Sequence, residues 1–68
     1  MLWTAALENV RIAGASKEFG QAMVDNPETT LAGAPESLRA EIERNKMDRD
    51  RWQTFVAMYD VKDPNKKR

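Results

Sequence analysis

Apolar residues recur at helical spacing over most of the chain. Between residues 2 and 13 the apolar side chains fall on one side of a helix. They are Leu2, Trp3, Ala6, Leu7, Val10 and Ala13. Gly14 interrupts this pattern, and glycine commonly follows the last turn of a helix. The sequence therefore predicts a first amphipathic helix that ends near Gly14.

Two further short helices are predicted before residue 35. Ser16 can cap a second helix, which must end near residue 25 because Pro27 disfavours helix at the residue before it. Asn26 and Pro27 then occupy the cap and first positions of a third helix. We expect Gly33 to close that helix in a left-handed conformation.

The longest predicted helix begins at Pro35 and runs without glycine or proline to about Asp60. Six large apolar residues share one of its faces. They are Leu38, Ile42, Trp52, Phe55, Val56 and Tyr59. Asn45 and Arg49 lie on the centre line of the same face. Each would be costly to bury without a polar partner, so we expect them in water or paired across an interface.

These patterns together predict an all-α fold. Strands find no support, because no alternation of apolar and polar residues is sustained. We expect two or three short N-terminal helices to pack on one long C-terminal helix, about residues 35–60. Residues 1–60 form a single small helical domain in this interpretation, and residues 61–68 form a polar tail that is basic at its end.

Composition narrows the possible functions. The 68 residues include no histidine and no cysteine, so the usual proton shuttle near neutral pH, the thiolate nucleophile and the commonest zinc ligands are all missing. Four acidic residues, Glu41, Glu43, Asp48 and Asp50, could serve acid–base catalysis. They alternate with arginine and lysine at spacings of three and four, which is typical of a solvated helix face with surface ion pairs. We therefore expect no enzymatic activity, no cofactor and no metal site.

The charges are balanced, with eleven basic and eleven acidic residues. A balanced chain lacks the electrostatic footprint of a nucleic-acid-binding protein, and the one candidate contact is the tail segment Lys66, Lys67 and Arg68. No apolar run approaches the ~20 residues of a membrane span, so we expect no membrane partner. The absence of cysteine is compatible with a reducing compartment. We expect a protein of the cytoplasm, or of a particle assembled there.

The residues that could contact a partner lie mainly on the predicted long helix. Trp52, Phe55, Val56 and Tyr59 form an aromatic-rich stripe. It can be core packed against the first helix, or a helix–helix contact surface, because Trp and Tyr are favoured anchors; in an oligomer it can be both. Met47 and Met58 fall on the opposite face, where they indicate a second contact surface or chance placement. The candidate interaction residues are Trp3, Leu7, Asn45, Met47, Arg49, Trp52, Phe55, Val56, Met58 and Tyr59.

A chain of this size builds only a small core, and this one has no disulfide or metal to support it. We therefore expect a small non-enzymatic interaction protein, a structural subunit or adaptor of a larger assembly such as a virion or another multi-chain particle. Self-association or a protein partner would then add stability with concentration. The alternative is a small regulatory protein that binds and blocks a larger protein or a nucleic-acid-handling machine.

Overall fold

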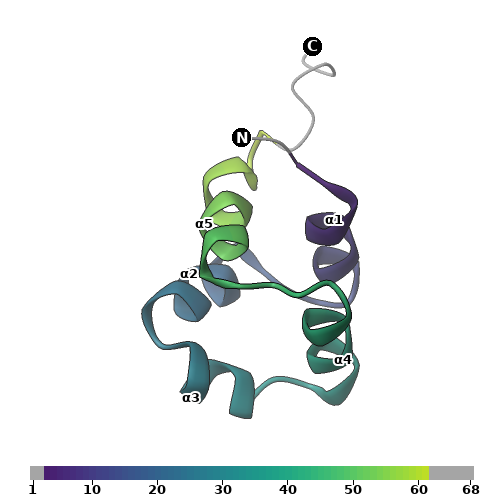
Figure 1. The fold of residues 1–68 in the computed structure, drawn as a ribbon. Helices are drawn as coiled ribbons and strands as arrows, with labels where there is room; N and C mark the ends of the chain where they lie inside the picture. Colours follow the sequence, from purple (N-terminus) through teal and green to yellow (C-terminus); the bar gives the residue numbers. More distant parts are fainter. Residues whose placement is uncertain (1–2, 62–68) are drawn as a thin grey trace.

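The computed structural model describes residues 3–61, which fold into five short helices with no strand among them. They are α1 (Ala5–Ile12), α2 (Lys17–Asp25), α3 (Pro27–Ala32), α4 (Glu36–Arg44) and α5 (Arg49–Met58). Figure 1 shows α1 and α4 on one side of the molecule and α2, α3 and α5 on the other. Helix α5 contacts both α1 and α2, so it joins the two sides. The all-α prediction is confirmed.

The second and third helices begin and end close to where the sequence predicts, whereas α1 begins only at Ala5, so the predicted helical conformation of Trp3 and Thr4 is wrong. The Ser16 hydroxyl accepts a hydrogen bond from the Phe19 amide at 3.0 Å, which caps α2. Pro27 occupies the first position of α3, as predicted. Gly33 follows α3 but has a φ of −92°, so the predicted left-handed stop at this glycine is wrong.

Helix α1 ends in a Schellman motif at Gly14. The Gly14 amide donates to the Arg11 carbonyl and the Ala15 amide donates to the Val10 carbonyl, both at 3.0 Å. Gly14 has a φ of 122°, which an L-residue side chain disfavours. Val10 and Ala15 are both buried, which is the apolar contact that accompanies this motif.

The prediction of one long helix over residues 35–60 is wrong, because a turn separates α4 from α5. This turn repeats the Schellman geometry with Lys46 in the left-handed position, at a φ of 52°. The Lys46 amide donates to Glu43 at 3.2 Å and the Met47 amide donates to Ile42 at 3.1 Å. Buried Ile42 and Met47 again supply the apolar contact.

Asp48 then starts the next helix. Its backbone is extended, and its carboxylate Oδ1 accepts a hydrogen bond from the Arg51 amide at 2.9 Å. Aspartate is among the best N-cap residues, because it satisfies an amide that has no partner inside the helix. The turn at residues 45–48 therefore follows from a cap and from burial of Met47, since neither glycine nor proline is present there.

The core lies between the two sides of the molecule. Ten apolar residues are buried in one cluster: Leu7, Val10, Ala15, Met23, Ala34, Leu38, Ile42, Met47, Trp52 and Phe55. Gly20 is what lets α2 approach α5, because a Cβ at this position would lie 2.6 Å from Cδ2 of Phe55. Helices α2 and α5 therefore pack closely where Gly20 faces Phe55.

No helix within residues 3–61 has the length and apolar character that crossing a bilayer requires. The basic segment Lys66, Lys67 and Arg68, and the start of the predicted first helix at Leu2, lie outside the described residues.

Candidate functional site

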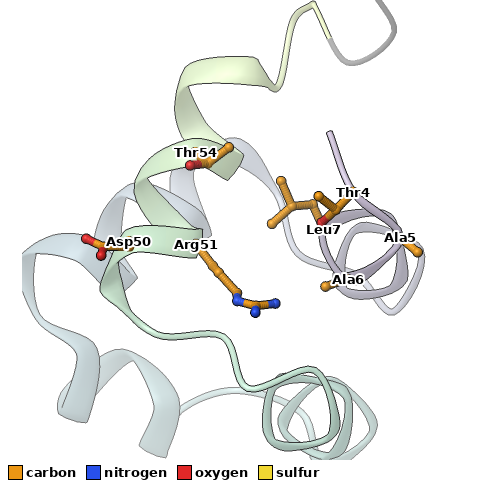
Figure 2. Close-up of a pocket in the computed structure, with 7 residues that line it drawn as sticks. All are labelled: Thr4, Ala5, Ala6, Leu7, Asp50, Arg51 and Thr54. Atoms are coloured by element: carbon orange, nitrogen blue, oxygen red, sulfur yellow. The ribbon is translucent and has the colours of Figure 1, made fainter. Parts of the chain in front are cut away.

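A groove of about 550 Å³ opens between the start of α1 and the first half of α5 (Figure 2). Its lining residues are Thr4, Ala5, Ala6, Leu7, Asp50, Arg51 and Thr54. Ala5 and Ala6 carry the smallest side chains that a helix commonly presents, so they leave room beside α5. We call this hollow the α1–α5 groove.

The floor of the groove is apolar and its edge is polar. Leu7 is only 1% exposed and lies at the bottom, with half-buried Ala6 beside it. Thr4 and Asp50 are exposed at the edge, and Thr54 is half-buried. An apolar floor with a few polar groups around it is the usual composition of a recognition site.

Arg51 supplies the positive charge of the groove, whose edge also carries the Asp50 carboxylate. In Figure 2 its guanidinium extends into the space between the helices, whereas the Asp50 carboxylate points away from it. Nη1 of Arg51 donates one hydrogen bond, to the Asn45 carbonyl at 3.3 Å. No carboxylate of residues 3–61 forms an ion pair with Arg51. Arg51 is exposed, and most of its five N–H donors have no partner among residues 3–61.

A second, smaller hollow of about 320 Å³ lies between α1 and α4. It is lined by Asn9, Ile12, Ala13, Ser37, Glu41 and Arg44. Its charges already compensate one another, because Nη1 of Arg44 lies 3.5 Å from Oε2 of Glu41. Ile12 is 69% exposed at its edge. This hollow offers a partner an apolar contact without a free charge.

The predicted aromatic stripe lies mostly in the core of the single chain. Trp52 is 1% exposed and Phe55 is fully buried, and their ring centroids are 5.0 Å apart. Trp3 stacks on Phe55 at 5.3 Å, and Tyr59 meets the same ring edge-on. Val56 is half-buried beside them. The prediction that this stripe forms core packed against the first helix therefore holds for Trp52 and Phe55.

Trp3 is also held from outside the core by Glu8. The Trp3 indole Nε1 donates to Oε1 of Glu8 at 2.8 Å, and the Arg11 Nε donates to the same oxygen at 3.0 Å. Hydrogen bonding to this carboxylate raises the pKa of Arg11. Glu8 in this way holds the first residues of the described chain against α5.

Asn45 and Arg49, predicted to share the centre line of one helix, lie on either side of the turn, and each has a polar partner. The Asn45 side chain donates to the Glu41 carbonyl at 2.7 Å and accepts from Asn9 at 3.1 Å. Arg49 donates to the Val24 carbonyl at 3.1 Å, where the last turn of α2 has no basic residue of its own. A cation at that end of a helix is favourable. Both side chains thus connect helices within the chain.

The expectation of two exposed methionines opposite the stripe is wrong. Met47 is only 7% exposed, because the turn directs it into the core, and Met58 is half-buried. The helix break also separates Arg44 from Asp48, which a continuous helix would place four residues apart on one face. Arg44 pairs with Glu41 instead.

The remaining acidic candidates are spread over separate elements. Asp48 caps α5, Glu41 is half-buried beside Asn45, and Glu43 and Asp50 are exposed. Residues 3–61 contain no group of three or more acidic side chains that could hold a metal ion.

Sequence reasoning identifies Leu7 but misses Arg51 and Thr54 as groove residues. The sequence pattern places Arg51 on a helix face where acidic and basic residues pair with one another. This continuous face does not exist, because the turn at residues 45–48 divides the helix. A usable signal is the pair Ala5 and Ala6, which are too small to fill the space beside a neighbouring helix. Comparison with known protein families, with curated proteins and with solved structures gives no match.

Proposed function

We propose that this protein is a small non-enzymatic interaction protein that docks on a larger protein through the α1–α5 groove. The observation that supports this is the Arg51 guanidinium, which faces an apolar floor and has no carboxylate of residues 3–61 as an ion-pair partner. Arginine is enriched at protein interfaces because its planar fork of donors matches a carboxylate.

The groove implies the chemistry of its partner. An aliphatic side chain would cover Ala6 and Leu7, and a neighbouring carboxylate would pair with Arg51. The partner is therefore an exposed segment of a larger protein in which Asp or Glu stands close to an aliphatic residue. A hydrogen bond between an arginine and a carboxylate is charge-assisted and can be bidentate, so it adds geometric specificity as well as affinity.

The distribution of apolar surface favours the regulatory form of this function over an obligate subunit. Within residues 3–61 the only large apolar side chains that are exposed are Ile12 and Val61. Obligate subunits bury large apolar interfaces, whereas transient partners use smaller ones. A regulator that stays monomeric until it meets its target fits this surface better than a subunit that completes its core in an assembly.

The test is selection of binding peptides and a charge reversal. Peptides selected from a random display library against the immobilised protein should be enriched in an acidic residue near an aliphatic one. Arg51→Glu should weaken their binding by about tenfold or more, which corresponds to the loss of one charge-assisted pair. Arg39→Glu is the matched control, because Arg39 is exposed on α4 and does not line the groove.

Circular dichroism of both variants shows whether the helices remain. Selection of no peptide, selection of peptides without acidic residues, or equal effects of the two charge reversals would each contradict the proposal. For a natural target, a blocker and an adaptor differ in that only the adaptor co-purifies in fixed stoichiometry with two partners at once.

A further inference from the structure

The turn between α4 and α5 holds a lysine in a conformation that its side chain disfavours. Lys46 is the only non-glycine residue among residues 3–61 with a positive φ, at 52°. The equivalent position after α1 is occupied by Gly14, which is the residue that usually fills it. The α4–α5 turn is thus the less favourable of two turns with the same hydrogen-bond pattern.

Most hydrogen bonds that hold this turn are local. They are the two backbone hydrogen bonds from Lys46 and Met47 back to α4, the Asp48 cap, and the hydrogen bond from Arg51 to the Asn45 carbonyl. The turn has two further contacts with the rest of the chain, because the Asn45 side chain accepts a hydrogen bond from Asn9 of α1 and Met47 is buried in the core. No residue between 36 and 60 is glycine or proline. The sequence can therefore form one helix through residues 45–48, and the amides of the turn would then donate to helical carbonyls instead.

The contacts that hold α5 are, by contrast, with other parts of the chain. Phe55 packs against Gly20 of α2, and its ring stacks on Trp3. Lys17 pairs with Asp60 just beyond α5, with Nζ 2.9 Å from Oδ2. A second copy of the chain presents the same surfaces and can provide every one of these contacts, which is the basis of domain swapping.

We propose that residues 45–48 are a hinge, and that the protein has a second, dimeric state in which α4 and α5 join into one helix. In that state α5 of each chain packs on α1 and α2 of the other copy. Joining the helices releases Lys46 from its left-handed conformation and puts Arg44 and Asp48 four residues apart on one helix, a favourable pairing. It gives up the burial of Met47 against Ile42, so the monomer dominates in dilute solution.

Two substitutions at Lys46 should move this equilibrium in opposite directions. A β-branched residue tolerates a positive φ least, so Lys46→Val should favour the dimer. Lys46→Gly should favour the monomer, because glycine adopts the left-handed conformation freely. Arg39→Val is the matched control: it removes the same charge and adds the same side chain on an exposed position of α4.

Light scattering after size-exclusion chromatography over a concentration series measures the effect. Lys46→Val should lower the dimer dissociation constant by about tenfold or more relative to Arg39→Val. Because the chain contains no cysteine, a Lys17→Cys and Asp60→Cys pair can be joined selectively by a short bismaleimide. The joined cysteines should link two chains in the dimer and lie within one chain in the monomer.

A folded Lys46→Val protein that stays monomeric at every concentration would overturn the proposal, as would a dimer whose cross-links stay within single chains. If Lys46→Val fails to fold, wild type refolded at high concentration decides between the outcomes. If residues 45–48 are a hinge, refolded wild type contains a dimer that cross-links between chains, and refolded Lys46→Gly contains less of it. The absence of a dimer in wild type, or an equal amount of dimer in wild type and Lys46→Gly, contradicts the proposal.

Discussion

Gly20 matters because of the space it leaves for Phe55, and this gives the sharpest prediction for a single residue. Gly20→Ala places a methyl group against the Phe55 ring, whose Cδ2 lies 2.6 Å from the position that the added Cβ would take. Overpacking of this kind costs ~1–3 kcal/mol, against a gain of about 1 kcal/mol in helix propensity. We expect net destabilisation of up to about 2 kcal/mol, measured by urea unfolding.

Gly33→Ala is the control for this prediction. Gly33 has a right-handed backbone, and the atoms nearest to an added Cβ lie 3.9 Å away. Its substitution should leave the free energy of unfolding within about 0.5 kcal/mol of wild type. Equal effects at both glycines would show that α2 does not approach α5 closely.

Trp52 combines a large apolar ring with an unsatisfied polar group. Its indole Nε1 is buried and has no hydrogen-bond partner among residues 3–61, and an unsatisfied buried donor costs ~1–3 kcal/mol. Trp52→Phe removes that donor and keeps most of the ring, so we expect a loss of less than about 2 kcal/mol in unfolding free energy. Trp52→Ala should cost ~3–5 kcal/mol. A loss in Trp52→Phe well above about 2 kcal/mol would indicate that the indole N–H has a partner.

At the scale of helices, substitutions at the equivalent positions of the two Schellman turns, Gly14 and Lys46, should change stability in opposite directions. Gly14→Ala forces a side chain into a φ of 122°, and we expect it to destabilise the fold by ~1–2 kcal/mol. Lys46→Gly relieves the left-handed lysine and should stabilise the fold by up to about 1 kcal/mol. Thermal melts of both variants at low protein concentration measure the difference. A Lys46→Gly protein less stable than wild type would contradict the left-handed assignment.

These turns also explain which boundaries the sequence could predict. The end of α1 follows from Gly14, the start of α2 from Ser16, and the end of α2 and the start of α3 from Pro27, because each residue has a backbone preference or a cap that acts locally. The end of α4 after Arg44 could not be predicted from a local signal of this kind. Lys46 is a good helix former, and the turn depends on the burial of Met47, which is a property of the tertiary structure.

The same limit applies to the candidate site. The burial of Trp52 and Phe55 could be predicted as one of two interpretations, because helical spacing places them on one face. The groove could not, because it depends on how α1 lies beside α5 and on which way Arg51 points. A wrong continuous helix also placed Asn45 and Arg49 on one face, although each contacts a different helix.

For the whole molecule, the expectation that stability rises with concentration stays a prediction, and the proposed hinge provides its mechanism. Mass action stabilises any dimer as concentration increases. We expect the melting temperature of wild type to rise between dilute and concentrated samples, and that of Lys46→Gly to change less. Differential scanning calorimetry over a concentration series measures both. If the melting temperatures of wild type and Lys46→Gly depend on concentration in the same way, the protein self-associates by a route that does not involve the hinge.

At the scale of the whole molecule, the proposed function depends on a partner that occupies the α1–α5 groove. Titrating ¹⁵N-labelled protein with a selected acidic–aliphatic peptide and recording chemical shifts tests it most directly. We expect the largest changes at the amides of Ala5, Ala6, Leu7 and Thr54 and at the Arg51 Nε. Changes centred on Ile12 and the α1–α4 hollow, or spread evenly over the helices, would contradict it.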